Sequence, residues 1–353
     1  MAKSKRYFLN SVTSIYMVCL LCLSLNAQSS DFKHINFKKA DSIASTHYNS
    51  RLTNLPLLAF KLTKDLDTKV EKFRAIHTWV CQNIESDYAF AEKTIRKRKK
   101  YKNNQDAFSV WNARVKASVF KRLLNDKKTI CSGYAYLLKH LSTLADIECE
   151  IVNGYSKTVN TNIGKIDIPN HSWNAVRLNN SWYLVDATLA SGIFLVENHI
   201  FLKNYNNGYF LADPELFSKS HYPLDHKWLL LDNNLTLTDF VDAPLIYSSS
   251  YKHNVWPVSP KRLETKVSTE KDIIFSFKTL DGIEINDFQL VINKGFKLEK
   301  VKPNIIDEAG YIMFKYRFSK KGNYDVHLKI KDDIVASFTV HVAKKSVLKS
   351  NLI

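Results

Sequence analysis

Residues 171–187 read HSWNAVRLNNSWYLVDA, and this stretch predicts a β-hairpin. Two runs rich in aromatic and apolar residues flank Asn179-Asn180, and asparagine tolerates the positive φ of a two-residue hairpin turn. With this turn, paired residues have numbers that sum to 359, so Trp173 lies opposite Asp186. Side chains two positions apart share one face of the sheet, so we expect His171 and Asp186 to be diagonal neighbours about 7 Å apart.

His171 and Asp186 have complementary requirements in this hairpin. A half-buried carboxylate at the end of an apolar strand needs a hydrogen-bond donor, and an imidazole needs an acceptor that fixes its tautomer. The hairpin therefore predicts a hydrogen bond between the two side chains. A purely structural pair would meet the same requirements, so a catalytic interpretation depends on a nucleophile nearby.

Cys131 is the candidate nucleophile. The residues after it have helical spacing on one apolar face, namely Tyr134, Leu137, Leu138, Leu141 and Ala145. The thiol therefore lies in the first turn of a helix, where unpaired N–H groups and the helix dipole stabilise a thiolate. On its own, Cys131 could equally be a small apolar residue that begins a core helix. Together with His171 and Asp186 it indicates a catalytic triad.

A second amphipathic helix is predicted upstream, from Thr68 to about Glu85. Its apolar face repeats at steps of three and four residues and consists of Val70, Phe73, Ile76, Val80 and Ile84. Asp67 or Thr68 can cap its start. His77 and Trp79 lie in this helix, where we expect both to be packing residues.

The pattern of the sequence changes after about Tyr251. Residues 115–124 still predict a helix and residues 149–155 a strand, but beyond Tyr251 the helical periods disappear. Apolar and polar residues then alternate over three segments, 273–277, 312–318 and 324–330. Period two with turn residues between the segments predicts an immunoglobulin-like β-sandwich at about 258–345, with at least six strands and essentially no helix.

The N-terminus has the features of a secretion signal. Three basic residues precede an apolar run from about Val12 to Leu25, and Ala27 offers a small residue for cleavage. We expect residues 1–27 to be a signal peptide cleaved after about Ala27, and the mature protein to be secreted or periplasmic. No later stretch is apolar over a length that predicts a transmembrane anchor.

Three cysteines follow the predicted cleavage site: Cys81, Cys131 and Cys149. An odd number leaves at least one thiol unpaired in an oxidising compartment. Cys81 and Cys149 both lie in apolar patterns, which suit buried free thiols or a mutual disulfide. Cys131 differs because it begins a helix.

The chain is basic, with a formal net charge of +17. Much of the excess lies in the segment Arg96–Lys102. We favour a solvated helix face and loop there over a surface that binds an anionic envelope polymer. Nucleic acid is disfavoured as a partner, because the sequence contains no base-reading motif.

Four blocks occur in order along the chain: Cys131-Ser132-Gly133-Tyr134-Ala135, Asn153-Gly154-Tyr155-Ser156-Lys157, His171-Ser172-Trp173-Asn174-Ala175-Val176 and Trp182-Tyr183-Leu184-Val185-Asp186-Ala187-Thr188. This order resembles the motifs of the transglutaminase-like superfamily, most closely a bacterial secreted member of its kyphoscoliosis-peptidase-like branch. The resemblance covers about residues 65–245. It departs from the family at Lys128-Thr129-Ile130, where relatives often have a Gly-Val pair, and at Leu189, where a tryptophan is common.

The resemblance implies a papain-like α+β transglutaminase core at residues 65–250. We expect a helical lead-in at 28–64 before this core and the β-sandwich at 258–345 after it. It implies Cys131 as nucleophile, His171 as base and then acid, and Asp186 as the residue that orients His171. The implied enzyme is a secreted cysteine peptidase, amidase or transglutaminase that forms an acyl-enzyme with a protein or peptide, peptidoglycan included. The N–H of Cys131 would stabilise the oxyanion, with Trp111 as a candidate second donor.

A non-catalytic peptide- or glycan-binding scaffold that retains the fold is the alternative. The triad would distinguish the two functions, because a binding module has no need of it. The histidines and cysteines form no HExxH or CxxC grouping, and no calcium-loop pattern occurs. We therefore expect neither a metal nor a cofactor.

Overall fold

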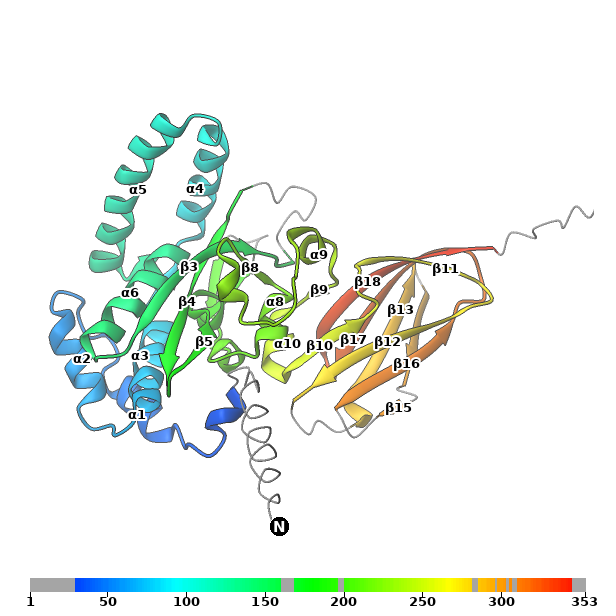
Figure 1. Cartoon of the computed structure of the whole chain (residues 1–353), viewed down its shortest axis with the longest axis horizontal. Coiled ribbons are helices and arrows are strands. Elements are labelled where there is room, and N and C mark those ends of the chain that lie inside the picture. Colours follow the sequence, from blue (N-terminus) through cyan, green and yellow to red (C-terminus); the bar gives the residue numbers. More distant parts are fainter. Residues whose placement is uncertain are drawn as a thin grey trace, which may run out of the picture.

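The computed structural model describes residues 29–344, apart from 160–167, 196–199, 281–284, 296, 303–304 and 307–309 (Figure 1). The predicted leader, residues 1–27, lies outside the described residues. The fold is α+β, as predicted, with helices and an antiparallel central sheet in the N-terminal part and β-sheets in the C-terminal part. No helix in the described ranges combines the length and apolar character needed to cross a membrane.

Six helices form most of the N-terminal part. They are α1 (Lys38–Thr46), α2 (Leu55–Thr63), α3 (Lys69–Asn83), α4 (Tyr88–Tyr101), α5 (Gln105–Asp126) and α6 (Cys131–Leu144). Helix α3 begins after Thr68, which forms a reciprocal capping box with Glu71. His77 and Trp79 on α3 are fully buried, as expected of packing residues.

Helices α4 and α5 stand out from the rest of the molecule as a pair (Figure 1). Helix α5 is twice as long as the predicted helix at 115–124, because Asn104 caps it ten residues earlier. Only Val119 and Leu123 are buried on α5, so its apolar stripe is too short to mark its full length. The basic segment Arg96–Lys102 lies on the last turns of α4 and just beyond its end.

The central sheet has the strand order β5-β4-β3-β8. Its strands are β3 (Cys149–Ser156), β4 (His171–Leu178), β5 (Ser181–Val185) and β8 (His221–Pro223). The predicted hairpin register is confirmed, since Arg177 pairs with Trp182 and Asn174 with Val185. Asn179 and Asn180 form the turn with φ values of 47° and 65°. Strand β5 ends two residues before the predicted end.

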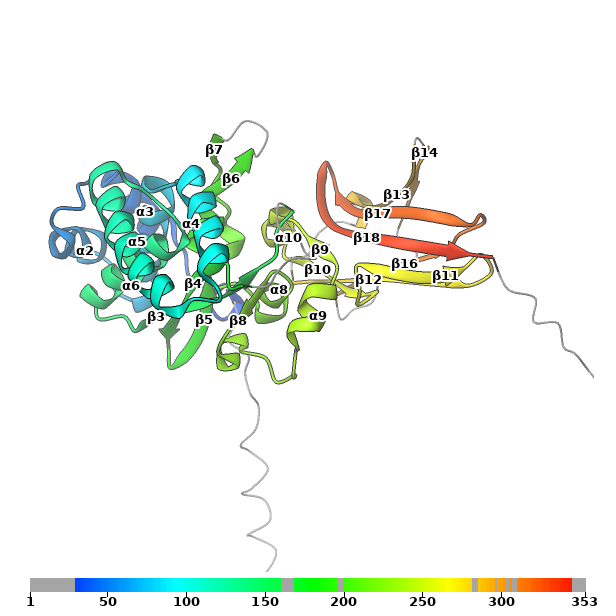
Figure 2. The ribbon, with the colours of Figure 1, turned by 90° about the horizontal axis from the view of Figure 1, so that it is seen from above.

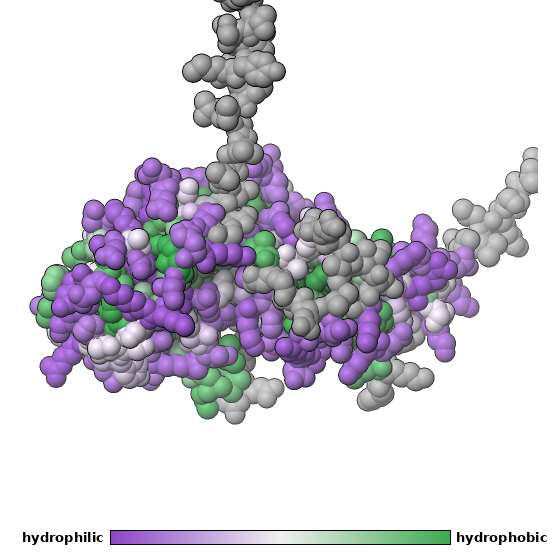
Figure 3. All heavy atoms as spheres, turned by 90° about the horizontal axis from the view of Figure 1, so that it is seen from below, coloured by the Kyte–Doolittle hydropathy of each residue, from purple (hydrophilic) through white to green (hydrophobic). Residues whose placement is uncertain are grey.

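Shorter elements connect the sheet to the C-terminal part. They are α7 (Ala187–Ser191), β6 (Gly192–Leu195), β7 (Ile200–Lys203), η4 (Asn207–Tyr209), α8 (Pro214–Ser218), η5 (His226–Leu229), α9 (Leu237–Asp242), β9 (Leu245–Ile246) and α10 (Ser248–His253). Strands β6 and β7 form a hairpin that projects from the body (Figure 2). Its exposed apolar side chains form the green projection in Figure 3 and include Ile193, Leu195, Ile200 and Leu202.

The C-terminal part is a β-sandwich, as predicted. One sheet has the order β10 (Val255–Ser259), β12 (Asp272–Thr279), β16 (Tyr311–Arg317), β15 (Ile305–Ile306). The other has the order β11 (Glu264–Ser268), β18 (Asp333–Ala343), β17 (Gly322–Ile330), β13 (Phe288–Lys294), β14 (Lys297–Val301), and β9 also pairs with β18. Among the described residues of 258–344, the only helical element is one turn, η6 (Ile285–Asp287).

Aromatic side chains fill the space between the two sheets, which Figure 2 shows as separate layers. Phe275 and Phe277 of β12 contact Phe338 of β18, with ring centroids 5.3 and 6.0 Å apart. All three side chains are buried. The apolar core continues without a break from the sandwich to α3 and the central sheet. The two parts of the chain therefore share one core.

Candidate active site

Three chain elements meet at Cys131, His171 and Asp186. Cys131 is the first residue of α6, and His171 is the first residue of β4. Asp186 follows β5 directly and caps the short helix α7. This cap explains why β5 ends at Val185: the chain must leave the strand for Asp186 to bind the N–H groups of the helix.

Asp186 accepts hydrogen bonds on both carboxylate oxygens. The backbone N–H groups of Thr188 and Leu189 donate to Oδ1 at 2.8 and 3.0 Å. Nε2 of His171 lies 2.6 Å from Oδ2. Burial alone would raise the pKa of Asp186, but the charge and hydrogen bond of His171 hold this pKa well below its usual value. The fully buried carboxyl group is therefore ionised.

His171 bridges Asp186 and Cys131. Since Nε2 faces the carboxylate, Nδ1 is the ring nitrogen left for the hydrogen bond with the Cys131 thiol. Burial would lower the pKa of His171, but the Asp186 carboxylate outweighs this effect and raises the pKa to about 10. The imidazole can therefore hold a proton next to the sulfur.

Cys131 is half-buried, unlike the other two cysteines. Burial raises the pKa of its thiol, but the hydrogen bond and charge of His171 outweigh burial, so the pKa lies below its ordinary value. In Cys81 and Cys149 burial is decisive and raises the thiol pKa, to about 12 for Cys149. Both are free thiols, so the disulfide left open by the sequence is absent between them.

Arg98 brings part of the basic segment to the site. Its Nη1 donates to the backbone oxygen of Pro169 at 3.4 Å, two residues before His171. The guanidinium charge also contributes to the lowered pKa of the Cys131 thiol. One residue of the segment that we expected to be only solvated therefore faces the thiol.

Trp111 lies on α5, in the outer part of the α4–α5 pair. Its ring packs against Tyr101 and Phe108, with centroids 6.0 and 5.8 Å apart. Its role as the second oxyanion donor stays a prediction.

His221 on β8 is a site residue that the sequence did not reveal. Its Nε2 lies 3.0 Å from Oδ2 of Asp186, the same oxygen that contacts His171. The side chain is buried, and no local pattern distinguishes it from a histidine in an ordinary apolar strand. His226, the next histidine along the chain, contacts Tyr222 instead, at 2.8 Å.

His171, Asp186 and His221 also resemble a metal-ligand set in composition. One ligand atom from each lies within 4.8 Å of the others. In this geometry, however, one carboxylate oxygen lies at hydrogen-bond distance from both ring nitrogens. The arrangement therefore favours a hydrogen-bonded network, and the expectation of no metal stays a prediction.

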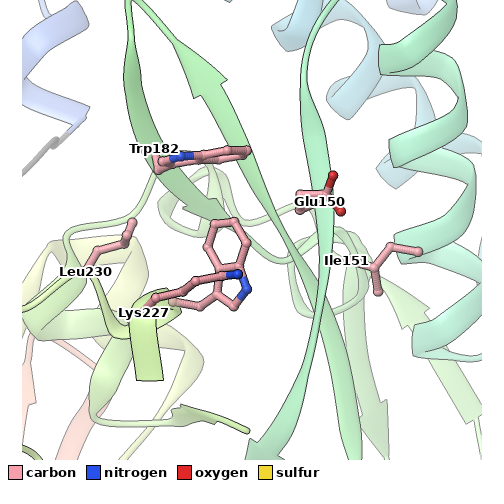
Figure 4. Close-up of a pocket in the computed structure, with 6 residues that line it drawn as sticks. Glu150, Ile151, Trp182, Lys227 and Leu230 are labelled. Atoms are coloured by element: carbon pink, nitrogen blue, oxygen red, sulfur yellow. The ribbon is translucent and has the colours of Figure 1, made fainter. Parts of the chain in front are cut away.

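Two clefts lie near these elements without containing the triad. A cleft of about 580 Å³ beside β3 and β5 is lined by Glu150, Ile151, Trp182, Lys227, Trp228 and Leu230 (Figure 4). The rings of Trp182 and Trp228 meet edge to face at 4.9 Å. A larger cleft of about 1010 Å³ separates the region of α7 from α10 and includes Thr188 and Leu189.

Comparisons with known proteins identify a transglutaminase-like domain in this chain. Residues 57–187 match the model of the transglutaminase-like superfamily, a range that includes all three residues. Human kyphoscoliosis peptidase is 28% identical over 321 residues, which is 87% of this chain and 44% of that protein. Hillarin of Drosophila melanogaster is 30% identical over 146 residues, or 38% of this chain and 18% of that protein. The chain thus spans less than half the length of these curated relatives.

Solved structures are similar only over parts of the chain. A crystal structure of a TGase has 16% identity and a TM-score of 0.25, and the match covers 45% of this chain and 36% of that one. The family model and the curated relatives carry the assignment instead. Residues 57–187 therefore form a domain that matches the transglutaminase-like superfamily, and most of the chain is similar to kyphoscoliosis peptidase.

Proposed function

We propose that this protein is a cysteine-dependent amide-bond enzyme of the peptidase, amidase or transglutaminase type. The observation that carries the proposal is the arrangement of His171, which contacts the Asp186 carboxylate through Nε2 and the Cys131 thiol through its other nitrogen. A lowered thiol pKa on a half-exposed cysteine at a helix N-terminus supports the role of nucleophile.

The proposed reaction has two halves. In the first, the Cys131 thiolate attacks the carbonyl carbon of an amide, and the backbone N–H of Cys131 stabilises the oxyanion. The imidazolium of His171 gives its proton to the leaving amine, so that the C–N bond breaks and a thioester remains. In the second, His171 takes a proton from water or from an acceptor amine as that group attacks the thioester. Water completes hydrolysis, whereas an amine completes transfer, and the free thiol returns.

The substrate class follows from the surroundings of the thiol. The match to the transglutaminase-like superfamily supports a protein or peptide substrate. Arg98 beside the site and the rest of Arg96–Lys102 on α4 favour a substrate with acidic groups, including peptidoglycan peptides or another anionic envelope polymer. The leader-like sequence at residues 1–27 supports a secreted or periplasmic location. A mature N-terminus near Gln28 in a periplasmic or culture fraction would test that location.

Thiol labelling followed by a substrate panel tests the function. Iodoacetamide at neutral pH should alkylate Cys131 much faster than Cys149, because only Cys131 has a lowered pKa. Acidic and neutral peptide amides and peptidoglycan fragments would then be incubated with and without a fluorescent primary amine. Amine incorporation identifies transfer, and release without incorporation identifies hydrolysis. Cys131→Ala should abolish both, and Cys149→Ala is the matched control.

Equal alkylation rates of Cys131 and Cys149, together with wild-type turnover no greater than that of Cys131→Ala, would refute the proposed enzymatic function. A peptide- or glycan-binding module is the second candidate. The cleft with Trp182 and Trp228 favours it, since paired indole rings are suited to sugar or peptide surfaces. Binding of a glycan or peptide that survives Cys131→Ala and is lost in Trp228→Ala would support this second function.

A further inference from the structure

We propose that His221 is a positioning residue that holds the Asp186 carboxylate in place for His171. The inference rests on the proposed function, because it assigns His221 to the same reaction. Both imidazoles approach one oxygen, Oδ2, at 2.6 Å from His171 and 3.0 Å from His221. With Thr188 and Leu189 on Oδ1, the carboxylate contacts four donors from three chain segments.

Packing fixes the plane of the His221 ring. Phe217 stacks on it with centroids 3.8 Å apart and an interplanar angle of 18°. Trp173 meets it edge-on at 5.1 Å. The backbone around His221 is held as well, since its strand pairs with β3 at Ser156. The ring is buried, stacked on one face by Phe217 and packed along one edge by Trp173, and this packing holds Nε2 toward Oδ2 of Asp186.

The far side of the ring fixes the tautomer. Nδ1 of His221 lies 3.0 Å from the hydroxyl oxygen of Ser220 and 3.2 Å from that of Tyr251, and these two oxygens are 2.6 Å apart. Burial lowers the pKa of His221, so the ring is neutral and carries one proton. Since the ionised carboxylate only accepts, that proton lies on Nε2, and Nδ1 accepts from a hydroxyl group. The result is a continuous chain of hydrogen bonds from Tyr251 through His221 and Asp186 to His171, whose imidazole lowers the pKa of the Cys131 thiol.

The C-terminal sandwich supports the outer end of this chain. Tyr251 lies on α10, and its neighbours Lys252 and His253 each contact Asp333 of β18 at 2.8 Å. The backbone N–H of Tyr247 donates to the oxygen of Val335 in the same strand. Through these contacts the sandwich holds Tyr251 against the imidazole ring of His221, which in turn contacts Asp186.

His221→Phe keeps the aromatic shape and removes the donor to Asp186. The carboxylate is then fixed only at Oδ1 and by His171, so it can rotate, and the imidazolium next to Cys131 is less well held. Loss of an outer partner of this kind typically costs about 10- to 100-fold. His221→Gln places an amide N–H near the position of Nε2, whereas His221→Asn is too short to reach it.

The test measures the pH dependence of Cys131 alkylation by iodoacetamide, together with thermal unfolding, on the full chain. We expect His221→Phe and His221→Asn to lower the rate at pH 7 by about 10- to 100-fold and His221→Gln to remain within a few fold of wild type. His226→Phe is the matched control, because it removes a nearby imidazole that does not contact Asp186. Its profile should equal that of wild type.

Two results would overturn the positioning role. The first is a folded His221→Phe protein whose Cys131 alkylation has the rate and pH profile of wild type. If His221→Phe does not fold, equal alkylation rates and pH profiles of His221→Asn and His221→Gln have the same meaning. The second is a wild-type rate that falls with a chelator and returns with zinc, which would make the cluster a metal site. Failure of the proposed function looks different, since Cys131 would then react no faster than Cys149 in the wild type itself.

Discussion

Asp186→Asn should reverse the tautomer of His171 while leaving the fold in place. Asparagine caps a helix as well as aspartate does, so its oxygen can keep the bonds to Thr188 and Leu189. The amide nitrogen then faces Nε2 of His171 and of His221 in place of Oδ2. Because an amide nitrogen only donates, Nε2 of His171 must accept and the ring proton moves to Nδ1. His171 can then take no proton from Cys131.

The size of the effect follows from the charges at the site. With the carboxylate present, the pKa of His171 is about 10 and the thiol pKa is lowered. Without it, a thiol with an ordinary pKa of about 8.5 is only about 3% thiolate at pH 7. We therefore expect alkylation to slow by up to about 30-fold and turnover, which also needs the correct tautomer, to fall about 10³- to 10⁴-fold. The free energy of unfolding should change by only about 1–3 kcal/mol.

The assay is the rate of iodoacetamide modification at Cys131 from about pH 5 to pH 10, followed by mass spectrometry with Cys149 as an internal reference. Asp213→Asn is the matched control. Asp213 is also buried and caps a short helix, α8, with N–H groups at 2.8 and 3.3 Å, and it contacts no imidazole. An Asp186→Asn protein with the wild-type pH profile would refute the argument, because the carboxylate would then set neither the charge nor the tautomer of His171.

Three further predictions concern the surroundings of the site. Burial lowers the pKa of Lys157 to about 7, so the unfolded chain binds more protons than the folded chain from about pH 7 to 10. The free energy of unfolding should therefore rise with pH in this range, by up to about 1.4 kcal/mol per pH unit. Lys157→Met should flatten this slope, as measured by urea titrations at several pH values. Gly154→Ala would place Cβ 2.2 Å from the backbone oxygen of Tyr222 in β8, the strand that pairs with β3. We therefore expect a loss of about 1–3 kcal/mol or more in urea unfolding, and wild-type stability would contradict the packing. Arg98→Gln should slow alkylation of Cys131 a few fold at low salt and less at high salt, because the charge of Arg98 lowers the pKa of the thiol. Lys99→Gln, at an exposed position, is the control. An effect of Arg98→Gln that does not depend on salt would exclude an electrostatic role.

The sequence predicts those parts of the fold whose signals are local. The register of the hairpin follows from Asn179-Asn180 and alternation, and the start of α3 follows from the apolar period with a cap at Asp67 or Thr68, of which Thr68 is the cap in the structure. Helix α5 was predicted too short because most of its residues contact solvent and carry no apolar period. Strand β5 was predicted too long because Asp186 fits a strand pattern and a helix cap equally well.

The candidate site divides in the same way. The contact between His171 and Asp186 could be predicted because one turn fixes which face each side chain occupies. The helix start at Cys131 could be predicted from spacing alone. The place of Arg98 beside the thiol could not, since it depends on how α4 lies against the loop before β4.

The sequence by itself determined the α+β class, the sandwich and the pair His171–Asp186, because hydrophobic period and turn chemistry act over a few residues. Only the tertiary structure decided that His221 and Tyr251 complete the network around Asp186. His221 reaches Asp186 across 35 residues, through the pairing of β8 with β3, and Tyr251 reaches His221 from α10. A buried histidine in a short strand has no periodic signature, and its partner is set by which strand edges meet in the folded chain.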